Sequence, residues 1–253
     1  WLTFRQNSFV YGTGKREENL RGYFAAISAM DEQIGRLLDA VEEQGLADNT
    51  VILFTADNGM SMGQHGVWGK GNGTFPMNMY DSAVKVPFLI SWPGHIPANT
   101  VCSEMISACD LLPTILKLTG LSDKQPTGLP GRSFTELLKG EQRDHRDEVV
   151  IFDEYGPVRM IRTKEWKYVH RYPYGKHELY HLVDDPGEEK NLYGLPEYKK
   201  LVTQLKGRME KWFCTYSDPA IDGVRSAVNG SGQLCRPGVY AIYEDPFAPK
   251  GVE

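Results

Sequence analysis

The chain has 253 residues, of which 41% are hydrophobic and 24% are charged, and its formal net charge is −5. This composition is that of a globular chain long enough to bury a sizeable core. No run of Lys or Arg exceeds two residues, which argues against a nucleic-acid interface. No apolar run approaches the ~18 residues of a membrane-spanning helix. Because the net charge is negative, an anionic ligand must be attracted by local charge.

The first predicted element is a long amphipathic helix over residues 17–44, after an irregular polar start. Its apolar positions, including Leu20, Ile27 and Ile34, recur at three- and four-residue steps. This is the period of a helix with one apolar face. Gly45 follows as a natural stop signal.

Two apolar runs rich in β-forming residues predict strands at 50–55 and 86–91. An unbroken apolar run is typical of a strand that is buried on both faces of a parallel sheet. We therefore expect both runs to be central parallel strands of an α/β sheet. A helix at 111–118, with Asp110 as its cap and Gly120 as its stop, should follow. A loop over 121–133 and a short helix at 134–139 complete this part.

After about residue 145 the pattern changes to short strands separated by tight turns. Strands are expected at 149–152, 158–162, 166–170 and 178–182, and this spacing favours an antiparallel sheet. An amphipathic helix at 198–213 precedes a Gly/Pro/Ser-rich tail over 214–253. We thus predict an α/β core over 1–145 and a smaller α+β subdomain over 146–253. The four cysteines are either reduced thiols or include a Cys214–Cys235 bridge in an oxidising compartment.

The residues that carry chemistry follow the first strand, in the stretch FTADNGMSMGQHGVWGKG at 54–71. In α/β sheets, functional groups collect beyond the carboxyl ends of strands. Asp57 and Asn58 offer the hard oxygen ligands that Ca²⁺ or Mg²⁺ prefers. Lys70 supplies a point positive charge suited to a sulfate or phosphate oxygen. Each piece has a simpler interpretation: Asp-Asn-Gly is a common turn, His65 could be structural, and Lys70 could be solvated.

The order of these motifs resembles the second half of the type I sulfatase domain, in the alkaline-phosphatase-like superfamily. The similar stretches are the helix and strand ending in ILFTADNG, then GQHGVWGKG, then YDSAVKVPFLISWPG. MIRTKEWKYV and ELYHLVDDPGEEKNL resemble that family's C-terminal subdomain. The resemblance covers residues 17–213. It implies an alkaline-phosphatase-like mixed or parallel sheet, followed by a subdomain with an antiparallel sheet and a C-terminal helix.

The resemblance also implies roles for individual residues. Asp57 and Asn58 match ligands of a divalent cation, usually Ca²⁺, with Mg²⁺ or Mn²⁺ as alternatives. Lys70 matches a lysine that contacts the sulfate group. His65 lies in the same loop and is expected to take part in catalysis or to contact substrate. His177 is a further candidate for substrate binding.

One departure from the family pattern is large. The C/S-x-P-x-R motif, from which sulfatases make their formylglycine nucleophile, is absent. The nearest stretch, CRPGV at 235–239, has Val in place of Arg. We therefore expect the nucleophile on a segment upstream of Trp1, against which these residues pack. The residues given would be inactive by themselves, and a periplasmic or secreted location is slightly favoured.

Two other functions stay open at this point. A phosphodiester or phosphonate monoester hydrolase of the same superfamily would use the same cation geometry on a phosphorus substrate. A degenerate sulfatase-like protein would bind sulfated glycans without catalysis. The expected partners are accordingly a sulfated small molecule or glycan and the upstream segment.

Overall fold

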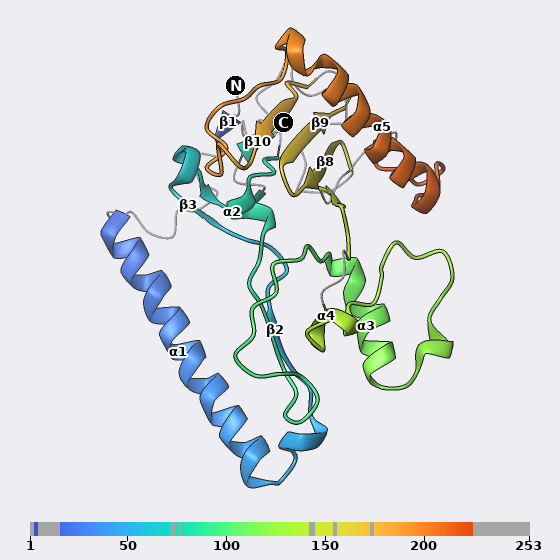
Figure 1. Ribbon diagram of the computed structural model, residues 1–253. Helices are drawn as coiled ribbons and strands as arrows, with labels where there is room; N and C mark the ends of the chain where they lie inside the picture. The colour runs from blue at the N-terminus through green and yellow to red at the C-terminus, as the bar shows by residue number, and fades with distance from the viewer. Residues whose placement is uncertain are drawn as a thin grey trace, which may run out of the picture.

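The computed structural model describes residues 3–4, 16–71, 74–75, 77–141, 145–153, 156–172 and 175–224. The tail beyond residue 224, including Cys235 and the CRPGV stretch, lies outside the described residues. Within the described part, no helix is both long and apolar enough to span a membrane. Figure 1 shows a mixed α/β arrangement, with long elements in the first half and a compact sheet-and-helix unit in the second.

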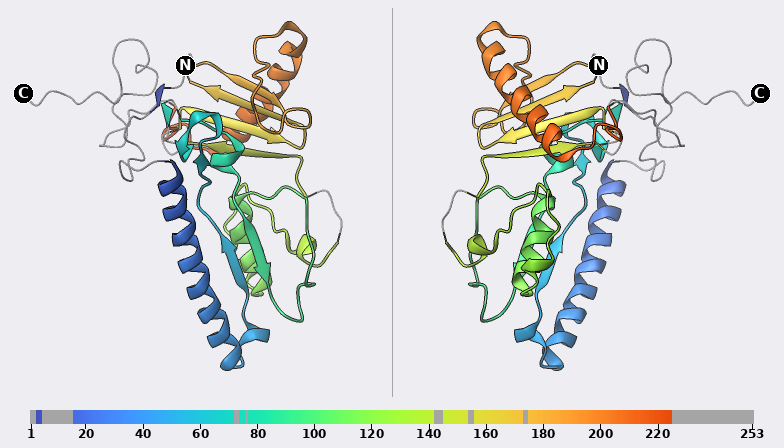
Figure 2. Two further views of the ribbon diagram at one scale, coloured as in Figure 1. Left: turned by 90° about the vertical axis from the view of Figure 1, so that its left-hand side faces the viewer. Right: turned by 90° about the vertical axis from the view of Figure 1, so that its right-hand side faces the viewer.

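The predicted first helix is confirmed as α1 (Arg16–Glu43), and Gly45 follows it with a left-handed φ of 64°. Figure 2 shows α1 running along one side of the first half of the chain. Its apolar face is open: Phe24 is 59% exposed and Leu37 is 65% exposed. Much of the apolar stripe that predicted the helix is therefore exposed, although Leu20, Ile34 and Val41 are half-buried.

The two apolar strands are confirmed as β2 (Ile52–Thr55) and β6 (Phe88–Ser91), but their expected parallel pairing is wrong. They are direct neighbours and run antiparallel, with Leu53 opposite Ile90. An apolar run indicates a hydrophobic environment and carries no information on strand direction. Nor is the pair buried on both faces, since Leu89 is 65% exposed.

The next helices are α3 (Leu111–Leu118) and α4 (Thr135–Leu138). Asp110 precedes α3 as predicted, but its side chain does not cap that helix. The carboxylate instead accepts hydrogen bonds from Ser107 N (2.8 Å) and Arg132 N (2.7 Å) and pairs with Arg146. Asp110 is fully buried, so it ties together three loop segments around α3.

The second half contains the predicted antiparallel sheet. Its strands are β7 (Glu148–Phe152), β8 (Val158–Thr163), β9 (Trp166–Arg171) and β10 (Glu178–His181), in the order β10-β9-β8-β7. Helix α5 (Lys199–Tyr216) covers one face. The core between them includes Ile161, Tyr168, Leu179, Leu205 and Met209.

The other face of this sheet is covered by the first half of the chain. Met77 and Met79 form a buried cluster with Val158, Met160 and Val169. The predicted boundary near residue 145 stays a prediction, and this cluster contains residues from both sides of it.

Several short elements lie between β2 and β6 and were not predicted. They are β3 (Ser61–Met62), β4 (Trp68–Gly69), β5 (Thr74–Phe75), which pairs with β1 (Thr3–Phe4), and α2 (Asp81–Val84). Single-turn 3-10 helices occur at Ala47–Asn49, Gln64–Gly66, Ala108–Asp110, Ser122–Lys124 and Pro196–Tyr198. Strands β3 and β4 form a small hairpin in the middle of the stretch with the candidate site residues.

Candidate functional site

The turn after β2 carries the first two candidate residues. Asp57 Oδ1 accepts a hydrogen bond from Asn58 N (2.8 Å), and Asn58 Nδ2 donates to Gly59 O (2.9 Å). Asp57 is exposed and Asn58 is half-buried. The turn and ligand interpretations are thus compatible, because the local bonds occupy one carboxylate oxygen and the amide nitrogen. Asp57 Oδ2 and Asn58 Oδ1 accept no hydrogen bond from any described residue.

Gly59 fixes this turn against α2. Its N–H donates to Ala83 O (2.9 Å). A Cβ atom at position 59 would lie 2.2 Å from the backbone oxygen of Ser82, a distance at which the backbone must shift. Only glycine allows this approach, so the Asp57–Asn58 turn is held at a defined place beside α2.

His65 lies at the tip of the β3–β4 hairpin. Its backbone is left-handed, with φ 54°, a conformation that non-glycine residues adopt rarely. Its ring stacks on Tyr80, with 3.7 Å between ring centroids and 4° between planes. The imidazole is therefore oriented by a residue on the segment that leads into α2.

Lys70 follows β4 directly and is half-buried. Its carbonyl oxygen accepts from Asn78 Nδ2 (3.4 Å), and the next carbonyl, that of Gly71, accepts from Asn78 N (3.0 Å). The loop that presents the Lys70 ammonium group is thus held by the same segment, residues 77–84, that contacts Gly59 and His65.

The donor chemistry at Asp57 and Asn58 fits a hard divalent cation, because both offer oxygen atoms. Ca²⁺ takes about six to eight such ligands, and two residues supply only part of that set. No group of three or more His, Cys, Asp or Glu residues suited to a metal occurs in the described part of the chain. The residues fit the cation but would have to be completed by other groups.

His177 lies away from these residues. Its ring stacks on His170, with centroids 4.0 Å apart and planes 11° apart. His170 is paired with Arg159 in the β8–β9 register, on the face of the sheet that α5 covers. Burial, reinforced by Arg171, lowers the pKa of His177 to about 4. The structure brings Asp57, Asn58, His65 and Lys70 to one support but leaves His177 on the opposite face of the sheet.

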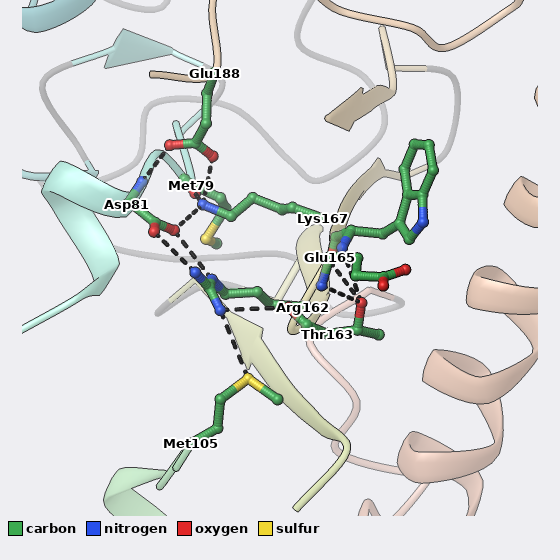
Figure 3. Close-up of polar contacts among 9 residues, drawn as sticks. Met79, Asp81, Met105, Arg162, Thr163, Glu165, Lys167 and Glu188 are labelled. Atoms are coloured by element: carbon green, nitrogen blue, oxygen red, sulfur yellow. Dashed lines mark hydrogen bonds and ion pairs between the residues drawn. The ribbon is translucent and has the colours of Figure 1, made fainter. Parts of the chain in front are cut away.

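A buried charge cluster beside the candidate site was not predicted from the sequence (Figure 3). Lys167 is fully buried and pairs with Asp81 and with Glu188 Oε1 (2.5 Å). Arg162 Nη2 lies 3.2 Å from Asp81 Oδ2. Burial alone would raise the pKa of the Asp81 carboxyl, but Lys167 and Arg162 together hold it below its usual range.

The signals for this cluster were present in the sequence. Asp81 follows Tyr80 in the YDSAVKVP stretch, and Glu188 ends the DPGE stretch, where it adopts a left-handed φ of 57°. Both stretches supported the family resemblance, yet neither spacing indicates that the two acids meet across one lysine. Pairing over such long sequence separations cannot be inferred from a single sequence.

Comparison with protein-family models gives two matches. Residues 63–214 match the model described as N-sulphoglucosamine sulphohydrolase, C-terminal, and residues 4–121 match the model described as Sulfatase. Together they span both the candidate loop and the C-terminal sheet.

Curated proteins similar to the chain include several sulfatases. An ulvan-active sulfatase of Formosa agariphila is 31% identical, over 81% of this chain and 40% of that protein. An N-acetylglucosamine-6-O-sulfatase of Bacteroides thetaiotaomicron is also 31% identical, over 81% of this chain and 37% of that protein. Human arylsulfatase A is 33% identical, over 77% of this chain and 45% of that protein. The chain thus spans less than half the length of these relatives.

Solved structures give a consistent fold. A structure described as in complex with its substrate D-glucosamine-2-N,6-O-disulfate aligns with a TM-score of 0.73 and 30% identity, over 83% of this chain and 43% of that one. A phosphonate monoester hydrolase of Agrobacterium radiobacter aligns with a TM-score of 0.66 and 26% identity, over 79% of this chain and 42% of that one.

Proposed function

The chain belongs to the sulfatase family, and from this premise we propose that it forms the C-terminal portion of an enzyme that hydrolyses sulfate esters. The relatives named above act on sulfated sugars or aryl sulfates according to their names. A sulfated sugar or small alcohol is accordingly the proposed substrate class.

The observation that carries this proposal is the shared support of the four candidate residues. The Asp57–Asn58 turn is attached through Gly59 to Ala83, the His65 ring rests on Tyr80, and the Lys70 loop is attached to Asn78. One short segment, residues 77–84, therefore contacts the three stretches of chain that carry a partial oxygen donor set, an imidazole and an ammonium group. This combination suits a tetrahedral oxyanion bound beside a divalent cation.

The residues divide the chemistry among them as follows. Asp57 and Asn58 would hold a divalent cation, Ca²⁺ by preference with Mg²⁺ or Mn²⁺ as alternatives, which when bound supplies positive charge to the sulfate oxygens. Lys70 stabilises the negative charge that develops on those oxygens as the S–O bond breaks. His65, held by its stack on Tyr80, contacts the substrate or the leaving oxygen.

A further segment of the same protein is part of this proposal. Strands β2 and β6 form a pair without a third strand among the described residues, and such a pair is marginal in water. The apolar face of α1 is open beside them. An upstream segment that adds strands to this pair and covers α1 would bring the nucleophile and the remaining cation ligands.

The test is a parallel assay of the complete protein on an aryl sulfate, an aryl phosphate and a phosphonate monoester. We expect release of sulfate that is lost with a chelator and restored by Ca²⁺. Faster turnover of the phosphonate would favour the second candidate, a phosphonate monoester hydrolase, which is considered because such an enzyme aligns with a TM-score of 0.66. Saturable binding of sulfated glycan with no turnover of any ester would favour the non-catalytic function.

A further inference from the structure

Residues 77–81 form a connector between the Lys70 loop and α2, and their contacts go in two directions. The backbone groups and the carboxylate of the odd-numbered residues bind buried charged side chains of the C-terminal sheet and the turn after it. The side chains of the even-numbered residues, Asn78 and Tyr80, bind the candidate loop. The side chains of Met77 and Met79 also pack against the sheet, so the side chains of residues 77–80 alternate between the sheet and the loop, as they do along an extended segment.

The contacts to the sheet are made at three alternate residues. In each, a charged side chain of the second half is 3% exposed or less and binds a backbone group of the connector. The pairs are Arg171 Nη2 with Met77 O (3.3 Å), Lys167 Nζ with Met79 O (3.0 Å), and Asp81 N with Glu188 Oε2 (2.6 Å). Because these side chains are buried, moving the connector would deprive each of them of a hydrogen-bond partner that water could not easily replace.

Asn78 makes the contacts to the Lys70 loop. The residue is 1% exposed, and the two hydrogens of its Nδ2 are shared among Lys70 O (3.4 Å), Gly71 O (3.1 Å) and Thr74 Oγ1 (3.3 Å). Its Oδ1 is buried with no hydrogen-bond partner among the described residues. A buried oxygen without a hydrogen-bond partner is unfavourable, so packing alone does not explain an asparagine at this position. The hydrogen bonds that its Nδ2 group donates to the loop do explain it.

Tyr80 makes the contact to His65. Its ring stacks on the imidazole at 3.7 Å on one side, and lies 6.5 Å from the ring of Tyr180 in β10. Tyr80 is 9% exposed, and the two tyrosines belong to one buried cluster. The orientation of His65 is therefore linked to a strand of the C-terminal sheet through a single side chain.

We propose that the C-terminal sheet positions the anion-binding loop through residues 77–81, with Asn78 and Tyr80 as positioning residues for Lys70 and His65. The expected effect on turnover rests on the proposed function. The expected effect on the position of the loop does not. The C-terminal subdomain is then a structural part of the active site, although none of its side chains needs to touch substrate.

The test compares Asn78→Ala, Tyr80→Leu and Tyr80→Phe in the complete protein. Hydrogen–deuterium exchange of peptides over residues 61–71 reports on the loop without any substrate. We expect at least tenfold faster exchange there in Asn78→Ala and Tyr80→Leu, and parental exchange in Tyr80→Phe, which keeps the stacked ring. With aryl sulfate, kcat/KM should fall about 10- to 100-fold in the first two, as expected for a catalytic group displaced by about 1 Å.

Leu205→Ala is the matched control. Leu205 is 1% exposed in the cluster between the sheet and α5, on the other face from the connector. It should lower the melting temperature but leave exchange of residues 61–71 and kcat/KM at parental values.

Parental exchange of 61–71 in both Asn78→Ala and Tyr80→Leu would overturn the proposal, as would an equal increase in Leu205→Ala. If one variant does not fold, the other decides with Tyr80→Phe. If the parental protein is inactive on sulfate esters, the proposed function is refuted. The exchange data would still test whether residues 77–81 position the loop.

Discussion

Lys70 is the candidate residue with the most direct chemical prediction. Its loop is held through two backbone carbonyls, which an alanine variant would keep. Lys70→Ala therefore removes the ammonium group without removing these contacts. In the complete protein, Lys70→Ala should lower kcat on an aryl sulfate by about 10²–10³-fold, the typical cost of removing one charge-stabilising donor. Lys139→Ala, at an exposed position after α4, is the charge-matched control. An unchanged kcat in Lys70→Ala would remove the residue from the site.

At the same scale, the four candidate residues illustrate what a sequence can locate. Their order behind an apolar strand was enough to place Asp57, Asn58, His65 and Lys70 in one loop region. It was not enough to identify Asn78, because a buried asparagine is recognised only by the carbonyl groups around it. The sequence also grouped His177 with substrate binding, whereas its ring packs against His170. That role stays a prediction, and the stacking favours packing.

At the scale of elements, the contact between the connector and β9 depends on Lys167. Its ammonium group neutralises two carboxylates, those of Asp81 and Glu188. Lys167→Met keeps the length of the side chain but leaves the buried Glu188 without its cation and Asp81 with Arg162 alone, and we expect a loss of about 3–5 kcal/mol in the free energy of unfolding. Urea denaturation measures this loss. Lys206→Met, at a half-exposed ion pair on α5, should change stability by less than about 1 kcal/mol.

Two histidines, His170 in β9 and His177 just before β10, should make the stability depend on pH. Burial lowers the pKa of His170 to about 3 and that of His177 to about 4. An unfolded histidine takes up a proton below about pH 6.5, while the folded chain binds fewer protons. Stability must then fall as pH decreases from about 6.5 towards 4.

Between pH 7 and pH 5, we expect a loss of roughly 2 kcal/mol, after allowance for solvent screening around half-buried His177. Urea midpoints at the two pH values would measure it. His177→Phe should reduce the difference, because only His170 would then titrate differently in the two states. A pH difference that is the same in the variant and the parent would exclude His177 as a source.

For the whole molecule, regular elements were predictable and their assembly was not. The period of α1 and the short runs and tight turns of β7 to β10 are local signals, and both were confirmed. The antiparallel pairing of β2 with β6, the role of Asp110 between three loops and the docking of residues 77–81 on the C-terminal sheet depend on distant partners. A single sequence contains no measure of such distances, so the parallel pairing was wrong and the connector was overlooked.

The open apolar face of α1 gives a prediction at this scale. Phe24 and Leu37 are 59% and 65% exposed, and apolar faces of this kind usually mark an interface. The 253-residue chain alone should self-associate, and Phe24→Glu with Leu37→Glu should make it more monodisperse in light scattering. In the complete protein the same pair should be destabilising, because the face would be covered there. Greater stability of the complete protein with both substitutions would contradict the proposed upstream segment.

The long separation between the connector and its anchors also constrains how the protein is made. Asp81 N bonds a side chain 107 positions later in the chain, and Met77 O one that is 94 positions later. A ribosome releases the candidate loop well before these anchors emerge, and contacts between distant residues form slowly. A nascent chain stopped short of Glu188 would therefore carry all four candidate residues and still lack one of the anchors that hold the connector beside them.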